Sequence, residues 1–132
     1  MSRIVIGYDG SDASKRALER AASLANGGPV VVVSAVAPLI SRAARLADPI
    51  EAEDHMRHLA EAKARLSELG IDATAVEGVG DPATVIAAEA DEMGADLIVV
   101  GSEGKGLLER LLVGSVSAGV TRKTTTDVLV VH

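Results

Sequence analysis

The chain has 132 residues, which suits one compact domain over residues 1–132 with a core of its own. It contains no cysteine, so disulfides, zinc–thiolate sites and thiol chemistry are excluded. A formal net charge of −6 argues against a nucleic-acid partner, and the single aromatic residue, Tyr8, leaves no stacking platform for bases. No apolar run approaches the roughly 18 residues of a membrane span. The first residues go straight into a strand pattern without the flanks of a signal peptide, so a soluble cytoplasmic protein is expected.

The first part of the chain alternates between strand and helix signals. Residues 4–6 form a short apolar strand that ends at Gly7, and Ser11 is a good N-cap for a helix with apolar residues at helical spacing. Residues 26–29, Asn-Gly-Gly-Pro, stop this helix. The β-branched run at residues 30–33 is typical of a strand that is covered on both faces.

The alternation continues in the rest of the chain. Residues 38–49 have no clear period and are expected to form a loop or a broken helix, and a long helix follows over residues 50–69. Asp81, followed by proline, supplies the N-cap of another helix, which ends before Gly94. The other predicted elements are strands at residues 71–77, 96–100 and 128–131 and a short helix at residues 115–123.

This order of elements predicts an α/β protein, with an open parallel sheet and helices on both faces. Ligands of such sheets bind beyond the carboxyl ends of the strands, at the point where the strand order reverses. The first strand ends in Gly7, Tyr8, Asp9 and Gly10, and the fourth strand runs into Gly101. If these two strands are neighbours, Asp9 and the glycines that follow position 100 will face one crevice.

Four glycines lie in the stretch GSEGKGLLERLLVGS, residues 101–115. A structureless loop of this length in a compact domain is uncommon and usually functional, and glycine allows backbone to approach a ligand closely. Gly104 and Lys105 suggest a P-loop, but Gly106 stands where that motif needs serine or threonine. Nucleotide binding is therefore favoured over a plain surface loop, although not through a P-loop.

The spacing G-x2-G-x9-G-[ST] is met by Gly101, Gly104, Gly114 and Ser115. With this motif, and with the stretches IVIGYDGSDAS, GDPATVIAAEADEMGADLIVVGSEG, GSVSAGV and DVLVV, the chain resembles the ATP-binding branch of the universal stress protein family over its whole length. The resemblance implies a five-stranded sheet of flavodoxin-like order 3-2-1-4-5 and a homodimer. It also implies ATP as the ligand, together with Mg or Mn.

The resemblance further implies roles for individual residues. The three motif glycines and Ser115 would contact phosphates or ribose, Asp9 would lie near the ribose and the metal–phosphate group, and Ala35 and Val36 would meet the adenine edge. Physical chemistry supports these roles, because glycine-rich backbone can form an anion-binding nest and a helix N-terminus at Ser115 favours a phosphate. The candidate nucleotide-binding residues are Gly7, Asp9, Ala35, Val36, Gly101, Gly104, Lys105, Gly114, Ser115, Val116 and Ser117.

Several of these side chains also have simpler explanations. Asp9 can be a turn residue, since Asp-Gly is a common turn pair, or it can be the one protein ligand of a metal. Lys105 reaches a phosphate or is merely solvated. Ser14 is expected to be a first-turn residue and nothing more. His55 and His58 lie three apart on a helix, but without a third ligand a solvated face is the favoured interpretation.

These observations favour a stress-response or signalling module that binds ATP and hydrolyses it slowly or not at all. No catalytic residue is assigned, because Glu103 and Glu109 are weak candidates for a base that activates water. The alternatives are a slow ATPase and a dimeric protein-interaction module of the same fold without a nucleotide. Residues 128–131 would be a flat, apolar edge strand if they close the sheet, which suggests dimerisation through that edge.

Overall fold

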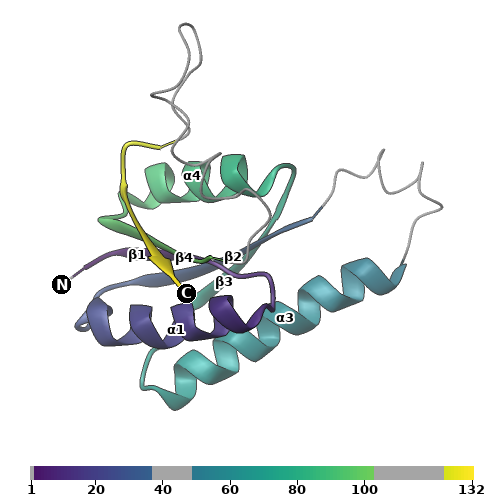
Figure 1. The fold of residues 1–132 in the computed structure, drawn as a ribbon, viewed down its shortest axis with the longest axis horizontal. Helices are drawn as coiled ribbons and strands as arrows, with labels where there is room; N and C mark the ends of the chain where they lie inside the picture. The colour runs from purple at the N-terminus through teal and green to yellow at the C-terminus, as the bar shows by residue number, and fades with distance from the viewer. Residues whose placement is uncertain (1, 37–48, 103–123) are drawn as a thin grey trace, which may run out of the picture.

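The protein is built around a five-stranded parallel sheet, seen in the computed structural model in Figure 1. The structure describes residues 2–36, 49–102 and 124–132. The elements in chain order are β1 (Ile4–Gly7), α1 (Asp12–Ala25), β2 (Val30–Val36), α3 (Pro49–Glu68), β3 (Thr74–Val79), α4 (Pro82–Met93), β4 (Leu97–Gly101) and β5 (Asp127–Val131). The strand order is β3-β2-β1-β4-β5, and all four strand pairs are parallel. The predicted fold class and strand order are confirmed.

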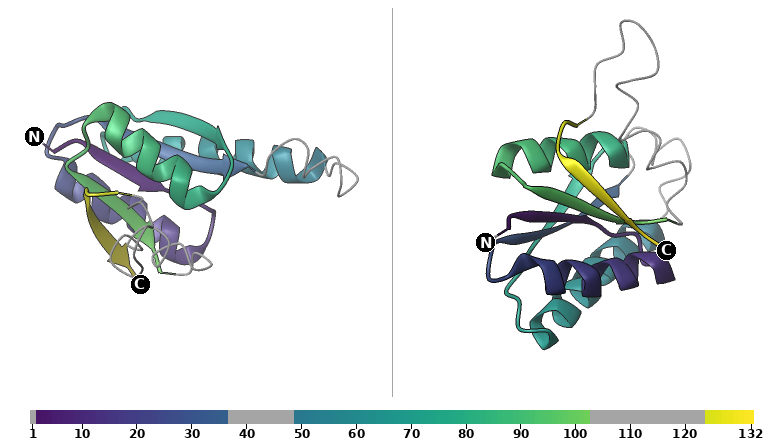
Figure 2. Two further views of the ribbon diagram at one scale, coloured as in Figure 1. Left: turned by 90° about the horizontal axis from the view of Figure 1, so that it is seen from above. Right: turned by 60° about the vertical axis from the view of Figure 1, so that its left-hand side comes forward.

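Helices cover both faces of the sheet, as the two views of Figure 2 make clear. On one face, α1 and α3 pack over a core that includes Ile4, Ile6, Leu18 and Leu66. On the other face, α4 packs over a second core that includes Val5. Successive residues of a strand point to opposite faces, so a central strand with helices on both sides must be apolar throughout. The run Ile4–Gly7 meets this need, because all four of its residues are buried.

α1 and α4 begin and end at the residues that the sequence predicts, and α3 is shifted by one residue from its predicted bounds. Ser11 is the N-cap of α1 and its side chain accepts a hydrogen bond from the Ser14 backbone N–H, while Asn26 closes the helix in the left-handed conformation. Asp81 caps α4 in the same way by accepting from the backbone N–H of Thr84. Gly94 ends α4 with a φ of 63°. Local capping chemistry therefore sets where these two helices begin and end.

Two strands differ most from their predicted bounds, while the last two differ by one residue. The strand expected at residues 71–77 begins at Thr74, because the backbone N–H of Ile71 donates to the Leu66 carbonyl at 2.8 Å and so belongs to the closing turn of α3. The second strand continues past the apolar run to Val36, since β3 pairs with it up to that residue. The predictions for residues 38–48 and for a helix at residues 115–123 lie outside the described residues.

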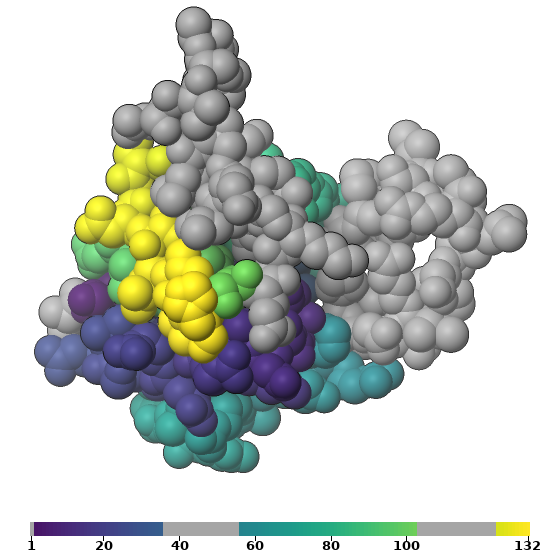
Figure 3. Space-filling model, in the orientation of Figure 1, coloured from purple at the N-terminus to yellow at the C-terminus, as the bar shows by residue number. Residues whose placement is uncertain are grey.

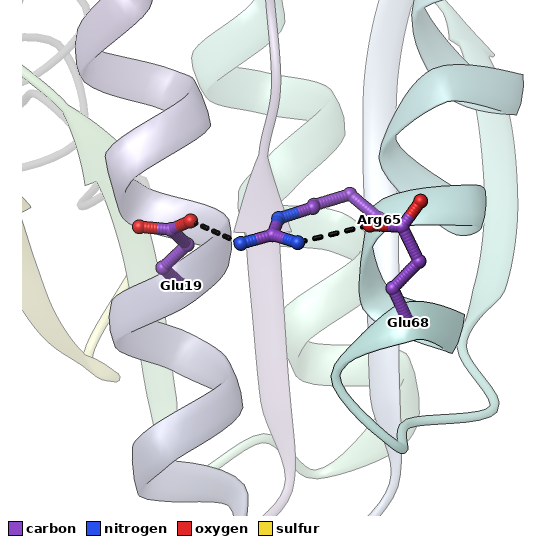
Figure 4. A network of polar contacts seen from close by, with 3 residues as sticks. All are labelled: Glu19, Arg65 and Glu68. Carbon is purple, nitrogen blue, oxygen red and sulfur yellow. Dashed lines mark hydrogen bonds and ion pairs between the residues drawn. The ribbon is translucent and has the colours of Figure 1, made fainter.

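An ion-pair network joins α1 to α3 on the surface (Figure 4). Arg65 of α3 lies 2.6 Å from Glu19 of α1 and 2.9 Å from Glu68 one turn further along its own helix. The hydrogen bonds to Glu19 and Glu68 raise the pKa of the Arg65 guanidinium. All three side chains are largely exposed, so the network adds little to the stability of the fold.

The C-terminal strand forms one edge of the sheet and lies on the surface beside α1 (Figure 3). Its chain end is fixed there, because Arg16 Nε of α1 donates to the His132 carbonyl oxygen at 2.7 Å. The apolar residues of β5 are only partly buried. Within the part of the chain that the structure describes, no helix is both long and apolar enough to cross a membrane.

Candidate functional site

The carboxyl ends of three adjacent strands come together at one edge of the sheet. β1 ends at Gly7, which pairs with Val33 of β2 on one side and with Val100 of β4 on the other. β2 continues beyond that level to Val36, and β4 continues to Gly101. We call this edge, made of residues 7–10, 35–36 and 101–102, the carboxyl-end edge. It is the predicted ligand position of an open α/β sheet, because strand order reverses between β1 and β4.

Asp9 lies in the turn between β1 and α1 and is held there by the helix N-terminus. Its Oδ1 accepts a hydrogen bond from the Ser11 backbone N–H at 2.9 Å. Gly10 makes the turn possible, because its φ of 82° is a conformation that residues with a Cβ rarely adopt. Partial burial acts to raise the pKa of Asp9, but hydrogen bonds from Ser11 and Ser14 outweigh it and hold the pKa below its ordinary value. Asp9 is thus an exposed, ionised carboxylate at this edge.

Gly101, at the end of β4, lies directly against the first turn of α1. A Cβ at this position would stand 2.6 Å from the Ser14 backbone nitrogen and 2.7 Å from the carbonyl carbon of Ala13. The sequence suggested that this glycine allows approach to a phosphate, and the structure adds a packing reason for it. Ser14 is a first-turn residue, as expected, but it is also buried between this glycine and the cap. A continuous series of contacts therefore joins Asp9 through Ser11 and Ser14 to Gly101.

The other predicted residues fall into two groups. Gly7 is buried, and a Cβ at this position would lie 2.6 Å from Ile86 Cδ1 of α4. Gly7 therefore packs against the core under α4. Ala35 and Val36 form the end of β2, where the expected adenine contacts would lie. The remaining candidates, Gly104, Lys105, Gly114, Ser115, Val116 and Ser117, lie outside the described residues.

Two residues beside Asp9 were not recognised in the sequence. Tyr8 is buried, with 5% of its surface exposed. Its pKa is raised mainly by this burial and, to a smaller extent, by the negative charges of Glu61 and Asp9. His58 of α3 lies edge-on to Tyr8, with ring centroids 6.3 Å apart. The expectation of a solvated face for His58 is therefore wrong, because α3 is turned so that this ring packs on the turn after β1. No local sequence pattern links positions 8 and 58.

Asp9 is suited to a metal ion only together with other ligands. Among the residues that the structure describes, no three His, Asp or Glu side chains gather in a group that could hold a metal. Mg²⁺ bound next to a nucleotide commonly uses one or two carboxylates, with phosphate oxygens and waters completing its shell. A single ionised carboxylate at the carboxyl-end edge fits that pattern.

The sheet order and the position of the candidate site place the protein in the doubly wound α/β class. Comparison with known proteins identifies its family within that class. The family model of the universal stress protein family matches residues 1–132. A universal stress protein of Mycobacterium tuberculosis is 36% identical over 140 residues, which cover 98% of this chain and 94% of the relative. The chain belongs to the universal stress protein family.

Solved structures of the family have the same fold. The crystal structure of a universal stress protein in complex with cAMP is 36% identical, has a TM-score of 0.72, and covers 99% of this chain and 97% of its own. The universal stress protein from Archaeoglobus fulgidus in complex with dAMP matches with a TM-score of 0.81 at 23% identity, over 100% of this chain and 98% of that one. At that identity the second match supports the fold alone.

Proposed function

We propose that this protein binds an adenine nucleotide at the carboxyl-end edge and acts as a stress-response or signalling module with little or no hydrolysis. The observation that carries the proposal is the meeting of the Asp9 turn, the N-terminus of α1 and Gly101 at the ends of the neighbouring strands β1 and β4. Membership of the family, in which a 36% identical protein was crystallised with cAMP, supports an adenine nucleotide as the ligand.

The charge of the edge favours a nucleotide accompanied by a cation. The Asp9 carboxylate lies at the start of α1, and its lowered pKa keeps it negatively charged. This charge would repel a bare polyphosphate brought to the same place. A divalent cation between Asp9 and the phosphates removes this repulsion. We therefore infer that ATP binds with Mg or Mn and that Asp9 is the protein ligand of the metal. Gly104, Gly114 and Ser115 would hold the phosphates, as the sequence motif implies.

Slow or absent hydrolysis follows from the role of Asp9 in this proposal. Its carboxylate is engaged by hydrogen bonds that lower its pKa, which makes it a weak base. A carboxylate that binds the metal is not free to activate water. The bound nucleotide would accordingly not be consumed, which suits a stress-response or signalling module in the cytoplasm.

Calorimetric titration with Mg-ATP and with cAMP tests the proposal. Saturable binding to the wild type is expected, with loss in the Gly114→Val, Ser115→Val double variant. Asp9→Asn should weaken Mg-ATP about tenfold, the scale of one charge-assisted contact, and should affect cAMP less. Asp81→Asn, which removes the charge of the α4 N-cap at the end of β3, two strands from Asp9, is the matched control. A folded wild type that takes up neither ligand contradicts the proposal.

β5 favours a second proposal, a homodimer formed through the C-terminal edge of the sheet. Its apolar residues, Val128 to Val131, are only half-buried in the single chain, and an apolar edge strand left uncovered invites pairing with another chain. Sedimentation equilibrium should give a dimer mass at micromolar concentration, and a monomer mass at every concentration contradicts the dimer. Binding of no nucleotide by a stable dimer would favour the alternative of a protein-interaction module.

A further inference from the structure

The ring of His58, which comes from α3, packs against Gly10 and Tyr8, the two residues that flank Asp9 in the turn after β1. A Cβ built on Gly10 would lie 2.7 Å from His58 Nε2 and 2.8 Å from Cε1, so the ring fills the space that a side chain at Gly10 would occupy. Tyr8, on the other side of Asp9, meets the same ring edge to face, with the two planes at 85°. Edge-to-face geometry is a favourable arrangement of two such rings.

This contact restrains the most flexible residue of the turn. Gly10 has the largest conformational freedom to lose on folding, because it has no Cβ, and its left-handed φ of 82° is held by packing instead of by a side chain of its own. Asp9 is anchored through the Ser11 N–H that follows this glycine. Any change of backbone conformation at Gly10 would therefore move the carboxylate relative to α1.

α3 presents the ring from a fixed position. Leu59, Ala62 and Leu66 of the same helix are buried against the sheet, and Arg65 joins the helix to Glu19 of α1. The ring of His58 thus lies between the packed helix α3 and the turn after β1.

We propose that His58 is a positioning residue of the nucleotide site, which holds Asp9 in place for the metal–phosphate group by packing against Tyr8 and Gly10. The inference rests on the proposed function, and it means that a residue of α3 contributes to nucleotide affinity. The contribution comes from the shape of the ring, so a flat aromatic ring without charge should preserve the affinity.

The test compares His58→Ala, His58→Phe and Leu66→Val in the full chain. Leu66 is buried two turns further along α3 and gives a structural control. Mg-ATP titrations well below the melting temperature should show His58→Ala weakened about tenfold, equivalent to ~1.4 kcal/mol, and His58→Phe restored to near the wild-type Kd. Leu66→Val should lower the melting temperature and leave the Kd unchanged. If His58→Ala does not fold, His58→Asn takes its place.

Amide hydrogen exchange without ligand supplies a second readout. The Ser11 N–H, which donates to Asp9, should exchange faster in His58→Ala than in the wild type, and at the wild-type rate in His58→Phe. Wild-type binding together with an unchanged Kd and unchanged Ser11 exchange in His58→Ala overturns the inference alone. Absence of Mg-ATP binding by the folded wild type overturns the proposed function and, with it, the role of His58 in that function.

Discussion

Replacing Gly101 by alanine tests the close packing between β4 and α1. The new Cβ would lie 2.6 Å and 2.7 Å from backbone atoms of Ser14 and Ala13, distances that real Cβ atoms essentially never show. Backbone cannot rotate away as a side chain can, so the first turn of α1 or the end of β4 must shift. Overpacking of this kind costs about 1–3 kcal/mol, which corresponds to a fall in Tm of roughly 3–12 °C for a domain of this size.

Gly7→Ala is the matched control, because both glycines end a buried strand and neither has a positive φ. The nearest atom to a Cβ at Gly7 is Ile86 Cδ1, the end of a side chain that can change rotamer. Gly7→Ala should therefore lower Tm less than Gly101→Ala, measured by thermal melts followed by circular dichroism at 222 nm, the usual helix signal. Equal Tm values for Gly101→Ala and the wild type would refute the reasoning, as would a larger loss in Gly7→Ala.

Three further predictions concern stability. Asp81→Ala removes the cap of α4 and should cost about 1 kcal/mol in urea unfolding; an unchanged midpoint would contradict this. Arg65→Gln breaks two exposed ion pairs and should change the midpoint less than Asp81→Ala does; the reverse order would show that the network is stabilising. Asp9→Asn should lower Tm at pH 7. The difference in Tm between this variant and the wild type should disappear as the pH falls below about 4, because the Asp9 carboxylate stabilises the fold only while it is ionised. A gap that is constant down to pH 2 would exclude that linkage.

The sequence was sufficient where local chemistry decides the structure. The caps at Ser11 and Asp81 and the stop at Gly94 follow from the preferences of single residues, and all three are present. The strand order came from the family resemblance, since periodicity alone says nothing about which strands are neighbours. β1 and β4 are neighbours, as the crevice hypothesis required.

The sequence was insufficient where distant segments meet. The packing of Gly101 against the first turn of α1 is one such case, because the glycine motif gives no sign of this partner. The ring of His58 looked solvated because helical spacing cannot say which element a polar residue will face. The start of β3 was predicted too early because Ile71 is apolar, although its backbone completes the turn that ends α3. Each of these outcomes is decided by tertiary contacts that no local pattern encodes.

The single buried tyrosine gives the molecule a built-in optical reporter. Tyr8 is the only aromatic residue, and the chain has no tryptophan to mask it, so all intrinsic near-ultraviolet emission of the protein originates beside Asp9. Its quantum yield will respond to the nearby carboxylates Asp9 and Glu61 and to the His58 ring. A cation that neutralises Asp9 should therefore change the emission without any label, and binding beside Tyr8 can be followed in real time in the unmodified chain.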